Sequence, residues 1–215
     1  MEKTFWHGVW ERNSIGFHQD EVHPFLISQF QSLINNQDKK VFVPLCGKSL
    51  DMFFLAEHMN VIGSELSEIA CQDFFSEQNI EYQRQVKGSF VQYSYQNISL
   101  LQGDFFQLAK KDIDEVDWIY DRAALIALPE SMQVDYVNAI RQLMDAGTKL
   151  LLITLEFPVQ ELTGPPFPVT EQRVNQLFSD FQITLLAEQE LSGGKFARRT
   201  FDVSYLKEKY FLIHA

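Results

Sequence analysis

Several features that mark large protein classes are scarce or missing in this 215-residue chain. It has two cysteines, Cys46 and Cys71, and neither belongs to a zinc-binding or disulfide-framework spacing. No uninterrupted apolar run approaches the roughly 18 residues of a transmembrane helix, and the first residues lack the apolar core of a signal peptide. A disulfide scaffold and a zinc module are therefore excluded, and we expect a reducing, cytoplasmic location with no membrane partner.

Basic residues are outnumbered as well. Lys and Arg total 18 against 29 Asp and Glu, so the formal net charge is −11, and no run of Lys or Arg stands out. Nucleic acids and anionic membrane surfaces both select a basic footprint, so neither is an expected partner. His18 and His23 lack the H-E-x-x-H pattern and a third ligand, so we expect no metal ion.

Apolar residues, by contrast, make up 46% of the chain and include 19 Phe. This content supports one well-packed domain over residues 1–215, in which residues 1–20 form an aromatic N-terminal arm with few helix or strand signals. Helix-like and strand-like segments alternate until a β-rich end. We therefore predict an α/β fold with a doubly wound, seven-stranded, mostly parallel sheet and a C-terminal antiparallel hairpin.

Strands are expected over residues 40–44, 60–64, 97–102, 117–120, 150–155, 182–190 and 199–212. Helices are expected over residues 21–34, 67–78, 132–144 and 174–178. A further helix should begin near Ser49, which is interpreted as its N-terminal cap. Gly147 is interpreted as the C-terminal cap of the helix 132–144. Residues 91–95 fit either a strand or an ordered loop.

The most informative segment closes the first expected strand and reads V-F-V-P-L-C-G-K-S at residues 41–49. It has a single glycine, so it is neither the G-x-G-x-x-G turn of dinucleotide enzymes nor a P-loop, which requires glycine where Phe42 stands. Glu65 ends the second strand, twenty residues after Leu45, where a ribose-binding acid is expected. S-adenosylmethionine, which has a ribose but no phosphate, fits best. The terminal hairpin is likewise typical of Rossmann-like class I methyltransferases.

Almost from end to end, the chain resembles the thiopurine S-methyltransferase family. The resemblance is carried, in the family's order, by W-E-R-N-S-I-G-F-H-Q-D-E-V-H (10–23), V-P-L-C-G-K (43–48), I-G-S-E-L-S-E (62–68), Y-D-R-A-A-L (120–125), G-P-P-F (164–167) and Glu208-Lys209 before a final strand. The chain looks like a compact, bacterial-type member. Ala123 departs from the glycine of many members, and residues 192–200 match loosely.

The resemblance implies S-adenosylmethionine-dependent methyl transfer to the sulfur of aromatic or heterocyclic thiols, with selenium and tellurium compounds as related acceptors. The reaction is a direct in-line displacement, so the protein mainly has to align the reactants and exclude water. We expect a small-molecule acceptor and a monomeric enzyme.

Position and resemblance together give the candidate site residues. The expected cofactor-binding residues are Trp10, Leu45, Glu65, Asp104, Phe105 and Arg122. The expected acceptor-binding residues are Phe17, His18, Pro166, Phe167 and Arg198, with Arg199 left open as the alternative to Arg198. Arg122 is also the expected catalytic residue, because its fixed charge can favour a thiolate. Residues 1–20 are expected to cover the active site.

Other interpretations stay open. Arg122 could form an ion pair with the adjacent Asp121, and Gly103-Asp104 could simply form a turn. The whole chain could be a dinucleotide oxidoreductase, although the second and third glycines of that motif are missing. It could also be a regulator that binds S-adenosylmethionine without catalysis.

Overall fold

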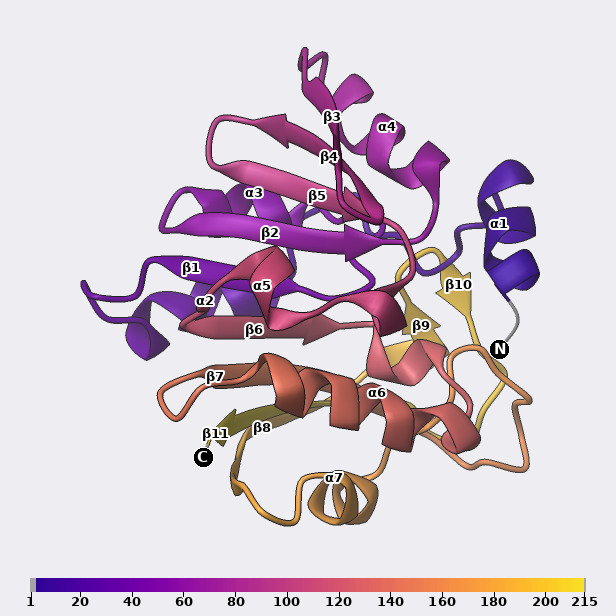
Figure 1. Cartoon of the computed structure of the whole chain (residues 1–215). Coiled ribbons are helices and arrows are strands. Elements are labelled where there is room, and N and C mark those ends of the chain that lie inside the picture. Colours follow the sequence, from indigo (N-terminus) through magenta and orange to yellow (C-terminus); the bar gives the residue numbers. More distant parts are fainter. Residues whose placement is uncertain (1–2, 215) are drawn as a thin grey trace.

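In the computed structural model, which describes residues 3–214, a nine-stranded sheet is covered by helices on both faces (Figure 1). The strand order is β3-β4-β5-β2-β1-β6-β7-β11-β8. The parallel centre consists of β5 (Ile98–Gln102), β2 (Asn60–Glu65), β1 (Lys40–Val43), β6 (Trp118–Arg122) and β7 (Lys149–Glu156). The antiparallel strands are β3 (Gln83–Lys87), β4 (Phe90–Tyr95), β11 (Lys207–His214) and β8 (Gln182–Glu190).

Helices fill the connections between these strands. They are α1 (Lys3–Glu11), α2 (Pro24–Leu33), α3 (Asp51–Ala56), α4 (Glu68–Ser76), α5 (Lys110–Ile113), α6 (Glu130–Leu143) and α7 (Glu171–Leu177). Short 3-10 turns are η1 (Phe105–Gln107), η2 (Leu125–Ala127) and η3 (Ser192–Gly194), and a small hairpin joins β9 (Lys195–Phe196) to β10 (Arg199–Thr200). Within residues 3–214, none of the helices is both long and apolar enough to cross a membrane.

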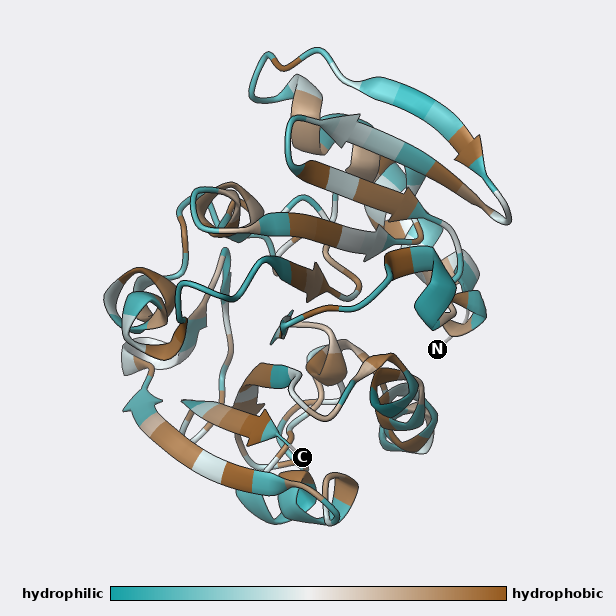
Figure 2. Ribbon diagram, turned by 60° about the vertical axis from the view of Figure 1, so that its left-hand side comes forward, coloured by the Kyte–Doolittle hydropathy of each residue, from teal (hydrophilic) through white to brown (hydrophobic). Residues whose placement is uncertain are grey.

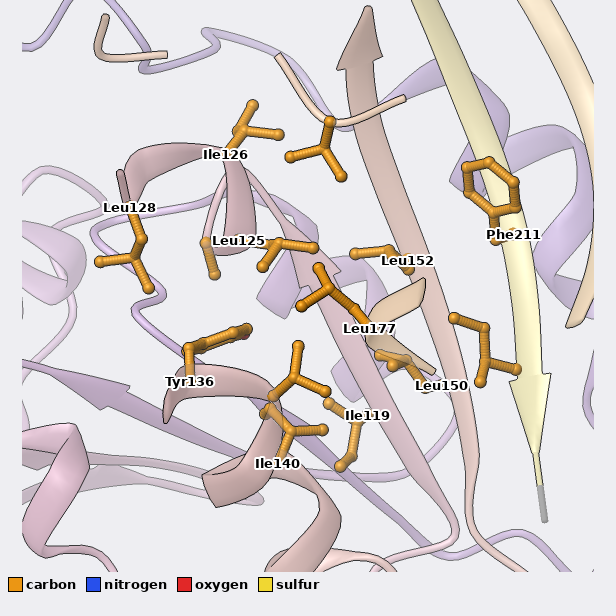
Figure 3. Close-up of a cluster of buried hydrophobic side chains, with 14 of the residues drawn as sticks. Ile119, Leu125, Ile126, Leu128, Tyr136, Ile140, Leu150, Leu152, Leu177 and Phe211 are labelled. Carbon is orange, nitrogen blue, oxygen red and sulfur yellow. The ribbon is translucent and has the colours of Figure 1, made fainter. Parts of the chain in front are cut away.

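The core lies in two layers, one on each face of the sheet. Leu150 and Leu152 of β7 pack with Tyr136 of α6 in the cluster drawn in Figure 3, whereas Leu151 and Ile153 pack into the cluster on the other face. Because both faces are covered, the central strand is a continuous apolar run, as expected for a parallel sheet. Complete burial of one such side chain contributes about 1.5–3 kcal/mol.

The predicted α/β class I fold with its parallel centre and C-terminal antiparallel strands is confirmed, but the sheet has nine strands rather than seven. The additional strands, β3 and β4, extend the edge beyond β5. Residues 91–95 are therefore a strand, not a loop. Every residue of β3 is exposed, and this uppermost strand is mainly hydrophilic in Figure 2. Such a strand has no apolar alternation for sequence analysis to detect.

The N-terminal arm is partly helical rather than irregular. Residues 3–11 form α1, which buries Val9 and Trp10. Trp6, Val9 and Trp10 follow the i, i+3, i+4 spacing of a helical apolar face, so the signal was present but short. Met1 and Glu2 of the expected arm lie outside the described residues.

One of the two predicted helix caps is confirmed in part, and the other is wrong. Helix α3 begins at Asp51 with Leu50 as its N-cap residue, but the Ser49 hydroxyl accepts from the Asp51 amide at 3.3 Å as well as from Arg122 Nη2 at 2.8 Å. Helix α6 ends at Leu143, and its C-cap residue Met144 has an extended backbone, so Gly147 lies beyond the end of the helix.

The expected strand 199–212 is also wrong in its first half. Residues 199–200 pair with β9 in the small hairpin, and the final sheet strand is β11. Glu208 and Lys209 consequently lie within the final strand rather than before it. Polar residues at the start of β11 are tolerated because each has charged or hydroxyl partners, including Tyr210 for Glu208 and Glu156 for Lys209.

Candidate active site

A cavity of about 480 Å³ opens at the carboxyl ends of the parallel strands. This is where α/β sheets bind ligands, beside the point at which the strand order reverses, here at β1. Helix α1 and the β9–β10 hairpin lie at the same edge of the sheet (Figure 1). The volume falls within the range of roughly 300–1,000 Å³ that is usual for small-molecule sites.

The turn after β1 and the end of β2 are joined through Glu65. One carboxylate oxygen accepts a hydrogen bond from the Gly47 amide at 2.9 Å, and the other accepts from the Ser67 amide at 2.7 Å. Glu65 is buried, and its burial raises the pKa of its carboxyl above the ordinary value, although the amide hydrogen bonds oppose this. A carboxylate has about four lone-pair sites, so the fixed group can still accept from two hydroxyls.

Trp10 of α1 lies directly against this turn. Gly47 adopts φ +54°, and a Cβ added there would lie 3.3 Å from the Trp10 ring. A side chain at position 47 would therefore be both conformationally strained and crowded. Leu45, with φ +45°, supplies another wall of the cavity. Glycine at position 47 therefore serves two purposes. It adopts the positive φ of the turn, and it leaves room for the Trp10 ring of the arm.

Asp104 and Phe105 line the cavity beyond the end of β5. One Asp104 oxygen accepts from the Phe106 amide at 3.1 Å, as in the turn considered from the sequence, and the other pairs with Lys3 Nζ at 2.7 Å. The Phe105 ring is buried and packs near Tyr136, with 5.1 Å between the centroids. Asp104 therefore connects this turn to the arm.

Arg122 at the end of β6 does not pair with Asp121. Its Nε donates to Asp51 Oδ2 at 2.6 Å, and its Nη2 donates to Ser49 Oγ at 2.8 Å. Asp121 instead accepts from Tyr136 at 2.6 Å and from backbone amides. Burial is the largest single effect and acts to lower the pKa of Arg122, but the charge and hydrogen bond of Asp51, together with Tyr120 and Glu208, outweigh it and raise that pKa, so the guanidinium stays charged.

At the other end of the cavity, aromatic, proline and cationic groups come together. The lining includes Phe17, His18, Pro165, Pro166, Phe196, Arg199 and Phe201. His18 is buried, and burial together with the charges of Arg198 and Lys48 lowers the pKa of its imidazole. This part of the cavity therefore combines aromatic and proline walls with the imidazole of His18, whose neutral form is favoured, and the charged guanidinium of Arg199.

Phe167 and Arg198 are not among the cavity-lining residues of the described chain. The Phe167 ring packs against Gly164, where an added Cβ would come within 2.7 Å of it. Arg198 is turned toward Asp20 and forms an ion pair with it. Arg199 lines the cavity and donates to the Pro165 carbonyl at 3.0 Å, so the structure distinguishes the two arginines that sequence analysis left open.

Lining residues that could not be identified from the sequence include Lys3, Arg12, Phe196 and Phe201.

Known proteins match the chain over its full length. The family model described as Thiopurine S-methyltransferase (TPMT) matches residues 1–215. A thiopurine S-methyltransferase from Shewanella sp. (strain MR-4) is 44% identical over 217 aligned residues, 99% of each chain, and one from Shewanella baltica (strain OS155 / ATCC BAA-1091) is 45% identical with the same coverage. The chain belongs to the thiopurine S-methyltransferase family.

Solved structures agree on the fold. A SAM-dependent methyltransferase from Anabaena variabilis superposes with a TM-score of 0.70 at 17% identity, covering 99% of this chain and 95% of that one. Magnesium protoporphyrin IX methyltransferase from Synechocystis, crystallised with bound SAH, gives 0.66 at 14% identity, covering 100% of both chains. At these identities the likeness shows the class I methyltransferase fold.

Membership of the family confirms S-adenosylmethionine-dependent methyl transfer as the activity and S-adenosylmethionine as the cofactor. The dinucleotide oxidoreductase and the non-catalytic regulator are not supported. The cavity fits this cofactor: Glu65 has lone pairs free for ribose hydroxyls, and the turn of Gly47 brings backbone close to a ligand.

Proposed function

We propose that this methyltransferase acts on the sulfur of aromatic or heterocyclic thiols, including thiopurines, and that selenium and tellurium compounds are further acceptors. One observation carries the proposal. The cation Arg122 lies in a single cavity with the cofactor turn and with a chamber lined by Phe17, Pro166 and Phe196. The relatives named thiopurine S-methyltransferases, at 43–45% identity, support the same acceptor class.

In this proposal, Trp10, Leu45, Glu65, Asp104, Phe105 and Arg122 hold the cofactor. Glu65 accepts ribose hydroxyls, since its orientation is already fixed by Gly47 and Ser67. Asp104 accepts from the adenine amino group, and Phe105 contacts the ring.

Phe17, His18 and Pro166 hold the acceptor. The expected roles of Phe167 and Arg198 are indirect, because Phe167 packs on the proline loop and Arg198 fastens the hairpin to Asp20. Arg199 takes the direct place beside the acceptor, since it lines the cavity.

Chemistry at this site needs alignment more than proton transfer. When bound, S-adenosylmethionine supplies a methyl group on a cationic sulfonium, which is an activated leaving group. Arg122 stabilises the thiolate form of the acceptor and orients it, and the aromatic and proline walls exclude water. A thiol with a pKa near about 8.5 is already partly ionised at neutral pH, so little base catalysis is required.

Residues 1–20 are proposed to form a cover that orders over the bound cofactor. This is supported by Trp10 against Gly47 and by the ion pair of Lys3 with Asp104. A cytoplasmic, monomeric enzyme without a nucleic-acid partner is also proposed. The free thiols of Cys46 and Cys71 suit a reducing compartment, and burial raises the pKa of both.

An acceptor screen with methyl-labelled S-adenosylmethionine tests the proposal. Thiophenols, thiopurines, selenite and tellurite are offered separately, with phenol and aniline analogues as controls. We expect labelled methyl sulfides from the thiols and little label in the oxygen and nitrogen analogues. Transfer to oxygen or nitrogen but not to sulfur would overturn the acceptor class.

A further inference from the structure

A buried polar network lies behind Arg122, and the chemistry proposed above does not use it directly. We propose that Asp51 is a positioning residue that aims the Arg122 guanidinium into the acceptor chamber. This inference rests on the proposed role of Arg122 in the acceptor step. It assigns a functional task to Asp51, the first residue of α3, which sequence analysis did not single out.

Asp51 is completely buried, and its carboxylate is held by β6 and by the segment before α2. Its Oδ2 accepts from Arg122 Nε at 2.6 Å and from the Tyr120 hydroxyl at 3.0 Å. Its Oδ1 accepts from the backbone amide of His23 at 2.8 Å. Because it is buried and held by these hydrogen bonds, the Asp51 carboxylate cannot turn to solvent or to another donor when one of its partners is removed.

The hydrogen bonds leave one nitrogen of Arg122 unused. Asp51 engages Nε and Ser49 engages Nη2, whereas Nη1 is buried and has no hydrogen-bond partner among residues 3–214. Because the guanidinium is planar, fixing two of its nitrogens also fixes the direction of the third. A buried donor without a partner calls for an explanation. Nη1 is closed to solvent, so a molecule in the cavity that Arg122 lines would supply the missing partner once the adjoining side chains shift.

A second layer holds the segment that contacts Asp51. The Phe25 amide donates to His23 Nδ1 at 3.3 Å, and His23 Nε2 lies 3.2 Å from Glu208 Oε2. Glu208 also accepts from the Tyr210 hydroxyl at 2.6 Å. This layer gives buried His23 and Glu208 a shared task, which is to fix the backbone amide that orients Asp51.

A structural role alone would predict something different. A buried carboxylate paired with a buried cation matters for folding whether or not the cation takes part in the reaction. If Asp51 acts through Arg122, its removal must slow turnover only while Arg122 is present. If it acts through the fold, its removal must lower activity by the same factor in either background.

A double-mutant cycle in the full chain makes this distinction. The variants are Asp51→Asn, Arg122→Gln and the double variant, assayed with thiophenol below the Tm of the least stable one. We expect Asp51→Asn to lower kcat by about tenfold or more in the wild-type background and by less than about twofold in the Arg122→Gln background. S-adenosylhomocysteine affinity, measured by calorimetry, should fall by the same factor in Arg122→Gln and in the double variant, because both lack a proposed cofactor contact, and by no more than that factor in Asp51→Asn. Equal factors in the two backgrounds, or wild-type kcat in Asp51→Asn, would overturn the proposal.

Two further variants keep the test decisive. If Asp51→Asn does not fold, Ser49→Ala removes the other anchor of the guanidinium and should lower kcat by a smaller factor, again only with Arg122 present. Asp38→Asn is the matched control, because Asp38 contacts Trp118 and Lys149 before β1, at the opposite ends of the strands. It should lower Tm while leaving kcat unchanged.

The thiol methylation activity of the wild-type enzyme is measured first. If the wild-type enzyme methylates no thiol, the proposed function is refuted, rather than the role of Asp51.

Discussion

The cofactor end of the cavity is built from consecutive strand ends, whereas the acceptor end joins segments that are far apart in the chain. At the cofactor end, the turn after β1 and the last residue of β2 are linked by the hydrogen bond between Gly47 and Glu65. At the acceptor end, the loops at residues 16–18 and 164–166 meet the β9–β10 hairpin and Phe201. There the Arg198 amide donates to Gly16 at 3.1 Å, and Arg199 donates to Pro165 at 3.0 Å.

This difference has energetic consequences. The cofactor turn is held by the hydrogen-bond ladder of the parallel sheet, whose opening requires disruption of the core. The acceptor end is held in part by polar contacts between exposed side chains, such as the ion pair of Arg198 with Asp20, which solvent screening weakens. We therefore expect the cofactor end to be preformed and the acceptor end to order as ligands bind.

The largest expected effect is at the preformed end. Glu65→Ala should weaken S-adenosylhomocysteine binding at least tenfold, because each hydrogen bond to a charged acceptor contributes about 1.5–3 kcal/mol. Calorimetry measures the affinity, and circular dichroism checks the fold, since Gly47 and Ser67 also lose a partner. Glu68→Ala is the matched control, because Glu68 is exposed and contacts Tyr93 and Arg84. An unchanged affinity in a folded Glu65→Ala variant would remove the ribose assignment.

At the junction of the two ends, Arg122→Gln should lower turnover by about tenfold or more, which is roughly 1.4 kcal/mol of transition-state stabilisation. Its Tm should also fall, because Asp51 loses its counter-charge in a buried site. Arg122→Lys keeps a charge but not the planar fork, so it should restore activity in part. Rates across a series of thiophenols provide the measurement. The deficit should shrink for the more acidic thiols, and a deficit independent of thiol pKa would leave Arg122 without a role in thiolate stabilisation.

Ligand-dependent ordering of the arm is the next effect. Hydrogen exchange in residues 5–18 should slow when S-adenosylhomocysteine is added, because Trp10 lies against the turn of Gly47, the proposed cofactor-binding turn. Residues 149–156 in the central strand β7 serve as the internal control and should change little. Equal exchange of residues 5–18 with and without ligand would mean that the arm is simply a fixed part of the fold.

The smallest expected effect is a pH dependence at the acceptor end. The pKa of His18 is lowered, first by burial and then by Arg198 and Lys48, with Asp20 and Glu77 opposing. The neutral imidazole is thus favoured in the folded state, so its contribution is present above the ordinary value of 6.5 and is lost as the pH falls below it. His18→Gln should therefore lose less Tm than the wild type between about pH 7.5 and 5.5. Parallel Tm curves would show that His18 titrates normally.

The cofactor end was predictable because its signals are local. A buried strand, a single glycine and an acid at a fixed spacing identify Gly47 and Glu65 before any contact is known. The partner of Arg122 was not predictable, because Asp51 lies 71 residues away in sequence and on another element. The sequence likewise gives no sign that the Ser49 hydroxyl, which accepts from the Asp51 amide at the start of α3, also accepts from that arginine.

The β9–β10 hairpin, which directs Arg198 and Arg199 to different partners, could not be predicted from the sequence either. Its turn is made by Ala197 at φ +52°, a conformation that sequence analysis expects of glycine or asparagine. Ala123 likewise adopts φ +66°. An alanine in that region carries a cost of about 1–2 kcal/mol, which the surrounding structure must offset.

The ion pair between Lys3 and Asp104 bears on how fast the enzyme can exchange its ligands. The Lys3 side chain is 57% exposed, so its attraction to Asp104 is screened by salt and is inexpensive to break. The arm is therefore held to the edge of the cavity by an ion pair that dissolved salt weakens. We expect the residence time of S-adenosylhomocysteine to shorten as ionic strength rises, which would make departure of the product, rather than the methyl transfer itself, the salt-sensitive part of the catalytic cycle.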